Sequence, residues 1–499
     1  MNGRTTGASA PFGDARSFAS NTLWTLLAEI IGKVASFILV VLIARSLGRV
    51  EYGVFAFILA FVPLFTIFGK TGLNTDVMQR LAKHPERLPD MLSSGLAARI
   101  GVGVVGLGIG LVVGSFLVTQ PGAREVLVVL GVALLLDEIS SYLGAVLKAF
   151  DRMKVYAIGA LVNRAVSTSL AAIVLAIGGS LLTVSVAYLG GSIAEVIVGS
   201  LMVRRVLRPG RLRRPDRSVM DELVRRAIPL GIAGVIGIAL FRIDTVMLQA
   251  IRGPAEVGLY GVAYRFLDSF LFVTYALAGV TLPRMAREAA TGRGIRAFEI
   301  SASLQLAFYL PIAVGAFFTA RWVVTTVFGP DYSSAAVAVV WLTAAGVLYA
   351  IAHTIRVALI ALDRRREVAW IAGTALAVNV GVNLYAIPAH GFVGAAVATL
   401  IAEIIESGLL GWQLVRSNGV PSLRPAVAPV AAVCLMAAFL WATRWSGAAA
   451  VAGGAVVYMG ALALSVRLIA PDVIKRAFPG APLPAWDAEV DRRDPAAAR

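Results

Sequence analysis

The chain has 499 residues, of which 58% are hydrophobic and only 15% are charged. Soluble domains carry about 25% charged residues, so this composition excludes an ordinary soluble protein and predicts a polytopic membrane protein. The formal net charge of +16 does not indicate nucleic-acid binding. The Lys and Arg residues fall between apolar runs instead of clustering on one aromatic-bearing face.

Runs of about 20 apolar residues, the length of a helix that crosses a bilayer, recur along the whole chain. They fall at 20–44, 53–73, 93–118, 125–147, 156–178, 182–203, 227–250, 257–282, 298–320, 335–361, 368–387, 393–415, 426–443 and 448–469. We therefore predict an all-α polytopic membrane protein with about 14 transmembrane helices. The first run is too long and too charged for a cleavable signal, so we expect it to remain as the first span.

Basic residues are concentrated in the loops that follow the even-numbered runs. The densest of these loops is 204–226, and others hold Arg80, Arg152 and Arg364. Because Lys and Arg are enriched in cytoplasmic loops, we predict that both termini and the 204–226 segment are cytoplasmic.

Three short sequences occur twice, in the same order and at nearly the same separation. Gly48–Phe55 (GRVEYGVF) matches Gly253–Tyr260 (GPAEVGLY), AFDR at 149–152 matches ALDR at 361–364, and IAEVI at 193–197 matches IAEII at 401–405. Ordered echoes of this kind indicate an internal repeat. Each repeat contains an even number of predicted helices, so we expect two six-helix lobes related by a pseudo-two-fold axis along the membrane normal.

The repeat predicts a division of the chain into six parts. These are a cytoplasmic N-terminal tail (1–17), an N-lobe (18–203), a cytoplasmic linker (204–226), a C-lobe (227–415), two extra C-terminal helices (416–470) and a disordered cytoplasmic tail (471–499). The last part is Pro- and Ala-rich with mixed charge, a composition typical of disorder.

Charged residues inside the predicted spans are the candidates for a functional site, because charge at bilayer depth is costly. Arg242, Asp244, Arg265 and Asp268 flank a predicted turn at Gly253-Pro254, which places the two arginines in one layer. Arg242 and Asp244 are two residues apart and cannot pair on a helix, whereas the i,i+3 spacing of Arg265 and Asp268 permits a pair.

Further charges lie in other predicted spans. The cations are Lys33, Lys70, Arg164 and Arg356, and the acids are Glu29, Asp137, Glu195 and Glu403. Lys33 either pairs with Glu29 at i,i+4 or faces a cavity. Lys70 either snorkels to the interface or faces the cavity. The acids either pair with the cations or bind a coupling ion or proton. Cations in both lobes at similar depth describe a cavity that suits an anion.

Motifs of enzyme and metal chemistry are absent from the sequence. It contains no HExxH, no Cys/His metal spacing and no nucleophile elbow, and GKT at 69–71 lacks the upstream glycine of a phosphate-binding loop. The single cysteine, Cys434, excludes an intramolecular disulfide. We predict no enzymatic activity, no cofactor and no metal site.

Several segments resemble the polysaccharide-biosynthesis or O-antigen (Wzx-like) flippases of the multidrug/oligosaccharidyl-lipid/polysaccharide exporter superfamily. They are NTLWTLLAEIIGKVASFILVVLIARSLGRVEYGVFAF at 21–57, KTGLNTDVMQRLAK at 70–83, FRIDTVML at 241–248, VGLYGVAYRF at 257–266 and VTLPRMAR at 280–287. The resemblance extends over about residues 18–470.

This resemblance implies two lobes that alternate between inward and outward openings. Such proteins move an undecaprenyl-diphosphate-linked oligosaccharide to the outer leaflet of the bacterial inner membrane, and basic residues of their helices 1, 2 and 8 contact the diphosphate. Lys33, Lys70 and Arg265 stand in those helices here. The expected partners are the lipid-linked substrate, membrane lipids, a polysaccharide polymerase and glycosyltransferases, with no nucleic acid.

The alternative is a multidrug and toxin extrusion cation antiporter of the same superfamily. Such antiporters have fewer helices and an acid-dominated cavity. The 14 predicted helices and the basic excess of this chain favour the flippase.

Overall fold

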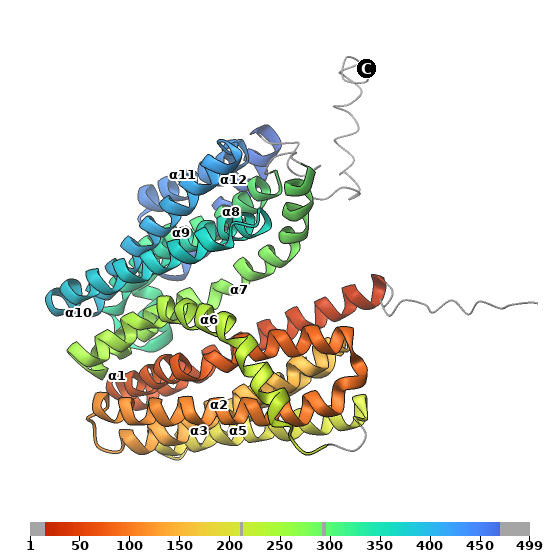
Figure 1. Ribbon diagram of the computed structural model, residues 1–499. Coiled ribbons are helices and arrows are strands. Elements are labelled where there is room, and N and C mark those ends of the chain that lie inside the picture. The colour runs from red at the N-terminus through yellow and green to blue at the C-terminus, as the bar shows by residue number, and fades with distance from the viewer. Residues whose placement is uncertain (1–14, 210–212, 292–295, 470–499) are drawn as a thin grey trace, which may run out of the picture. The chain divides into compact units, whose positions relative to one another are not determined.

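The computed structural model describes residues 15–209, 213–291 and 296–469 (Figure 1). Side chains are not described at 15–27, 67–71, 230, 233, 289–291, 418, 468 and 469. Within these limits the chain is helical and contains no strand.

Twelve α-helices make up the part of the chain that the structure describes. They are α1 (Ala15–Lys83), α2 (Leu88–Leu117), α3 (Ala123–Ala149), α4 (Met153–Ala176), α5 (Leu181–Met202), α6 (Arg217–Arg252), α7 (Pro254–Thr291), α8 (Arg296–Phe328), α9 (Ala335–Ala361), α10 (Arg365–Asn418), α11 (Arg424–Thr443) and α12 (Gly447–Ile469). Short single turns lie at Pro85–Arg87, Val203–Leu207 and Pro330–Tyr332.

Twelve helices of the described chain are long and apolar enough to cross a membrane, and two of them are double. Helix α1 is kinked at Gly48 (φ 79°), and α10 is kinked at Gly391 (φ 57°). Glycine reaches these positive φ values without a Cβ clash. The chain therefore bends at one residue, and helix continues on both sides of it. Each kink falls between two predicted apolar runs, and the predicted all-α membrane fold is confirmed.

The turn between α6 and α7 forms where the sequence predicts it. Gly253 ends α6 with a φ of 83°, and Pro254 opens α7, where its missing N–H and fixed φ fit the first turn of a helix. Helix α6 begins earlier than the predicted span, because the Asp216 carboxylate accepts a hydrogen bond from the Ser218 N–H at 2.8 Å and caps its N-terminus. Residues 217–226 of the predicted linker are therefore helical.

The chain forms two compact units whose limits differ from those of the predicted lobes. Of the described residues, the first unit comprises those up to 269 with 324–338 and 372–402, and the second comprises those of 270–323, 339–371 and from 403 onward. The division into lobes stays a prediction.

In the first unit, α2, α3 and α5 lie side by side, and α1 contacts α2, α3, α4 and α6 (Figure 1). One end of this unit has an apolar cluster that includes Val77, Met91, Val146 and Leu223. A buried ion pair joins Arg99 of α2, 1% exposed, to Glu138 of α3.

The second unit has two apolar clusters. Ala352 and Leu359 of α9 pack with Leu410 of α10 in one cluster. In the other, Met436 of α11 and Tyr458 of α12 pack with residues of α8. The Tyr458 hydroxyl also donates a hydrogen bond to the Ala307 carbonyl at 2.6 Å, which ties α12 to α8.

Candidate functional site: a cation-lined cavity

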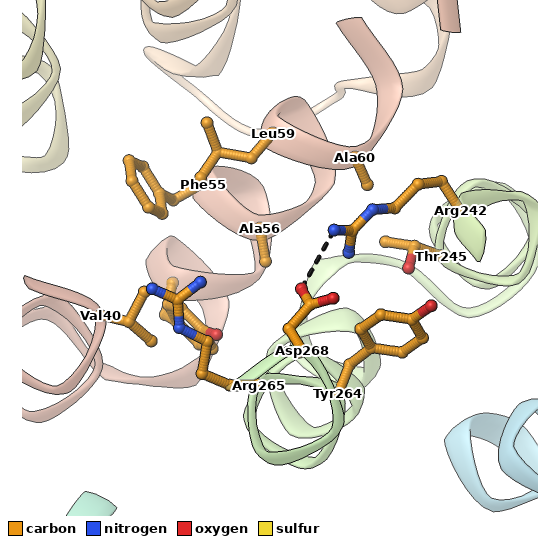
Figure 2. A pocket seen from close by; sticks show the side chains of 12 residues that line it. Val40, Phe55, Ala56, Leu59, Ala60, Arg242, Thr245, Tyr264, Arg265 and Asp268 are labelled. Atoms are coloured by element: carbon orange, nitrogen blue, oxygen red, sulfur yellow. Dashed lines mark hydrogen bonds and ion pairs between the residues drawn. The ribbon is translucent and has the colours of Figure 1, made fainter. Parts of the chain in front are cut away.

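A cavity of about 90 Å³ lies among α1, α6 and α7 of the first unit (Figure 2). Its lining consists of Val40, Tyr52, Phe55, Ala56, Leu59 and Ala60 of α1, Arg242 and Thr245 of α6, and Gly261, Tyr264, Arg265 and Asp268 of α7. Small and apolar side chains of α1 form one wall, and the charged groups come from the other two helices. Asp268 is the one acid among these lining residues, which also include two arginines.

Arg242 forms its ion pair across the cavity, with a residue of another helix. Its Nη2 donates to Oδ2 of Asp268 at 3.0 Å (Figure 2). The guanidinium also lies over the ring of Tyr264, 5.0 Å from its centroid, so a cation–π contact adds to the ion pair. This geometry agrees with the expectation that Arg242 and Asp244 need separate partners.

Arg265 does not pair with Asp268, although their spacing permits it. The Asp268 carboxylate faces Arg242, and Arg265 lies beside Val40 on the α1 side of the cavity (Figure 2). The buried Nε of Arg265 has no hydrogen-bond partner, and no carboxylate of the described chain lies within ion-pair distance of its guanidinium. Within the described chain, the cavity therefore presents a cation without a direct ion pair.

Two more of the predicted cations lie close to this cavity. Lys33 of α1 donates from Nζ to the backbone carbonyl of Asp268 at 3.5 Å, and in the described chain it forms no ion pair with Glu29, which is exposed. Arg164 of α4 is close enough to interact electrostatically with both Lys33 and Arg265. The fold thus brings together four predicted cations from four helices. The side chain of Lys70 lies outside the described part of the structure.

Asp137 and Glu195 form a polar network next to Arg164. The Asn163 amide donates to Asp137 Oδ1 at 3.0 Å and to Glu195 Oε2 at 2.7 Å, and the Tyr188 hydroxyl donates to Asp137 Oδ2 at 3.2 Å. Arg164 interacts electrostatically with both carboxylates. These two acids thus offset charge on Arg164, whereas Arg265 has Asp268 as its acidic electrostatic partner, and Asp268 is already paired with Arg242.

Asp244 is 1% exposed and is held by neutral donors. Its Oδ2 accepts hydrogen bonds from the Tyr260 hydroxyl at 2.7 Å and from Thr399 Oγ1 at 2.6 Å. Its Oδ1 has no hydrogen-bond partner. Within the described chain Asp244 forms no ion pair, so a buried carboxylate here depends on two hydroxyl groups.

Arg356 and Glu403 belong to the second unit. Arg356 forms an ion pair with Glu406, which is 1% exposed, and its Nη1 lies 3.3 Å from Nδ1 of His353. Glu403 interacts electrostatically with Arg356. Arg356 is therefore compensated inside its own unit.

The aromatic and hydroxyl residues of the site are not among the residues predicted from the sequence. Tyr260, Tyr264 and Asp268 stand at i,i+4 spacing, and Thr245 stands three residues after Arg242. The helical spacing of these polar residues from a buried charge is a pattern that could have identified them as part of the site.

Helices of spanning length and a charged cavity within them define a multi-pass membrane protein. The chain belongs to the family of polysaccharide biosynthesis proteins, whose family model matches residues 18–288. A relative in Haloferax volcanii, the probable low-salt glycan biosynthesis flippase Agl15, is 22% identical over 409 residues, which cover 78% of this chain and 82% of the relative.

Solved transporters share the fold. The lipid II flippase MurJ in an inward closed conformation matches with a TM-score of 0.72 and 13% identity, over 89% of this chain and 99% of that one. An inward-facing multidrug resistance transporter of the MATE family matches with a TM-score of 0.60 and 14% identity, over 78% and 94%. At these identities the likeness concerns the fold alone.

Proposed function

We propose that this protein is a flippase for a lipid-linked oligosaccharide, and that the cavity binds the anionic diphosphate of that substrate. The observation that carries the proposal is the charge of the site. Arg242, Arg265 and Lys33 converge there, and Asp268 is the single acid of the lining. Membership of the polysaccharide biosynthesis family and the names of Agl15 and MurJ support the same function.

The two arginines contribute in different ways. Arg265 offers a guanidinium without a direct ion-pair partner in the described chain, and its planar fork matches two oxygens of one phosphate. Arg242 is held by Asp268 at 3.0 Å, so an arriving phosphate competes with an internal anion for it. Asp268 thereby limits how tightly the substrate is held and allows its release.

The remainder of the cycle follows from the substrate's chemistry. The polar sugar and diphosphate need the cavity, whereas the lipid tail remains in the bilayer. We propose that the lipid is undecaprenyl, that the two predicted lobes open alternately to the two sides, and that a polysaccharide polymerase and glycosyltransferases act with this protein.

We further propose that the protein spans a bacterial cell membrane with both termini and the 204–226 segment in the cytoplasm. A single cysteine replacing Pro215 in a Cys434→Ala background tests this topology. A membrane-impermeant thiol reagent should label it only after the cells are permeabilised. Labelling in intact cells would contradict the topology without affecting the proposed site.

A cation antiporter is the second candidate. Asp244 favours it, because a buried carboxylate without a cationic partner suits a cation or a proton. The cavity argues against it, since organic cations would meet Arg265 and Lys33. A coupling ion at Asp244 is compatible with either function.

The decisive experiment measures binding and export together. The Arg242→Gln, Arg265→Gln double variant should lose surface polysaccharide in a strain without its own copy. The purified variant should bind a diphosphate-linked oligosaccharide lipid roughly tenfold or more weakly, because each charge-assisted contact contributes about 1.5–3 kcal/mol. Arg124→Gln, which removes an exposed cation outside the cavity, should behave as wild type. Normal export by a stably expressed double variant would rule out the anion site.

A further inference from the structure

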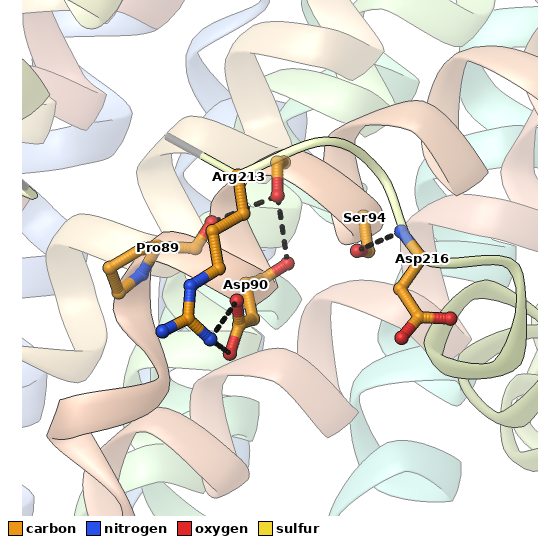
Figure 3. Close-up of polar contacts among 6 residues, drawn as sticks. Pro89, Asp90, Ser94, Arg213 and Asp216 are labelled. Atoms are coloured by element: carbon orange, nitrogen blue, oxygen red, sulfur yellow. Dashed lines mark hydrogen bonds and ion pairs between the residues drawn. The ribbon is translucent and has the colours of Figure 1, made fainter. Parts of the chain in front are cut away.

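The segment between α5 and α6 is fastened to the start of α2 at one end of the first unit. Arg213 donates from Nη1 to both carboxylate oxygens of Asp90, at 3.3 and 3.4 Å, and the Asp216 N–H donates to Ser94 Oγ at 3.0 Å (Figure 3). Leu223, which is fully buried, inserts into the apolar cluster of the same end. These contacts hold the chain around Arg214 and the first turns of α6 in place.

We call six arginines of this segment and of the first turns of α6 the basic rim. Its members are Arg204, Arg205, Arg208, Arg214, Arg217 and Arg225. All six are exposed, and no carboxylate of the described chain lies within ion-pair distance of any of them. Arg80, Arg213 and Arg226, by contrast, are paired with Glu222 or Asp90. Asp221 is exposed near Arg217 and Arg225 but pairs with neither.

The basic rim continues two stripes of exposed apolar side chains. On α5, Ile193, Ile197 and Leu201 are 44%, 53% and 45% exposed at i,i+4 spacing, and Arg205 follows at the next step. On α6, Ile232 and Ile228 are 52% and 41% exposed, and Arg225 lies one turn before them.

Exposed apolar side chains on a membrane span face lipid tails. A guanidinium one turn beyond them therefore lies at the level of the headgroup phosphates. Val203, 1% exposed, and Leu223 point into the protein from the turns that carry Arg204, Arg205 and Arg225, so these three arginine side chains point outward. Arg205 and Arg225 are thus placed where headgroups would lie if these helices span a bilayer.

We propose that the basic rim binds the headgroups of anionic phospholipids in the adjacent leaflet. A guanidinium without a carboxylate partner is available to a phosphodiester, and clustered basic residues next to a span each add to anionic-lipid affinity. A neutral, zwitterionic headgroup offers the same phosphate with a compensating cation. The basic rim therefore prefers lipids whose headgroups carry a net negative charge. This inference does not depend on the proposed transport function.

The test uses the purified full chain in nanodiscs of phosphatidylcholine with a rising fraction of phosphatidylglycerol. Native mass spectrometry after release counts the retained phosphatidylglycerol. Arg204→Gln, Arg205→Gln should weaken retention roughly fivefold for each arginine removed. The loss should shrink as salt rises to about 1 M, where the screening length falls to about 3 Å.

The matched control is Arg364→Gln, Arg365→Gln. It removes the same charge from another exposed basic loop, where Arg364 pairs with Glu367 and Arg365 with Asp363. The control should retain phosphatidylglycerol like wild type. Equal melting temperatures of all three proteins in pure phosphatidylcholine would show that neither variant is simply misfolded.

Three results would overturn the proposal. One is equal retention by the rim variant and wild type, as expected if these arginines only set topology. Another is equal loss in the rim variant and the control. The third is displacement of the lipid by a few millimolar inorganic phosphate, which would make the rim a site for free phosphate.

Discussion

Gly53 of α1 and Gly258 of α7 each lie against the backbone at the start of the other's helical segment. A Cβ on Gly53 would stand 1.8 Å from the carbonyl oxygen of Pro254, and one on Gly258 would stand 2.1 Å from the carbonyl oxygen of Arg49. Arg49 and Pro254 are themselves in register in the sequence repeat. The repeat therefore relates the two contacts to each other, as a local two-fold axis requires.

The first prediction is that alanine at either glycine lowers stability. Gly53→Ala and Gly258→Ala should each destabilise the protein by about 1–3 kcal/mol, because a methyl group there overlaps with backbone that cannot move aside. Chemical unfolding in detergent measures the effect. Gly101→Ala is the matched control, since nothing lies within 4 Å of its Cβ position. Wild-type stability of both variants would show that these helices do not pack this closely.

The second prediction concerns Asp268. Asp268→Asn should tighten binding of the diphosphate lipid roughly tenfold, because it removes the internal anion that competes for Arg242. Export should nevertheless fall, since release becomes slower. Titration of the purified variant and surface polysaccharide in cells give the two readouts. Weaker binding by a stable variant would indicate that Asp268 serves to orient Arg242 for the phosphate.

The third prediction tests the charge of Asp244. Thr399→Val removes one of two hydrogen bonds to its Oδ2 and should cost about 1.5–3 kcal/mol if the carboxylate is ionised. In an Asp244→Asn background the same substitution should cost about 0.5–1.5 kcal/mol, the range for a neutral acceptor. A double-mutant cycle measures the difference. Equal costs in both backgrounds would mean that Asp244 is protonated in the folded protein.

The fourth prediction is a pH dependence outside the membrane spans. The hydrogen bond from Arg80 holds the pKa of the Glu222 carboxyl below its ordinary value, aided by the charges of Arg80 and Arg226. A lowered folded-state pKa means that the ion pair contributes fully above the ordinary glutamate range. The contribution is lost as pH falls through the lowered pKa.

Thermal unfolding between pH 7 and pH 3 measures this effect. Arg80→Gln should reduce the loss of stability on acidification, because Glu222 then titrates near its unfolded value. Arg225→Gln removes a nearby cation that has no ion-pair partner in the described chain and should leave the profile unchanged. Identical profiles for Arg80→Gln and wild type would contradict the assignment.

Much of the fold follows from the sequence, because the bilayer imposes long apolar runs and every span leaves one. Gly48 and Gly391 separate such runs without interrupting the helix for more than a residue, and periodicity locates them as boundaries. Charges inside spans likewise predict Lys33, Arg164, Arg242 and Arg265 as site candidates, and the folded chain brings these four side chains close together.

The partners of these charges could not be obtained in the same way. Arg265 is close enough in sequence to pair with Asp268, but Asp268 pairs with Arg242 instead. The packing of α6 against α7 turns the side chains of Arg242 and Asp268 toward each other. Helix rotation and rotamer decide such a choice, and neither is encoded in spacing. Thr399 is also remote in sequence from Asp244, so only the folded chain brings them together.

The buried ion pair of Arg99 and Glu138 has a consequence for how the chain enters its membrane. An unpaired arginine or acid in the middle of an inserting helix costs about 2.5–3.5 kcal/mol. Because α2 and α3 are consecutive, a hairpin of the two carries both charges in together, already neutralised. Arg356 of α9 has no such neighbour, since Glu406 lies beyond the Gly391 kink of α10. The ion pair of α9 can therefore form only after the second half of α10 has been synthesised.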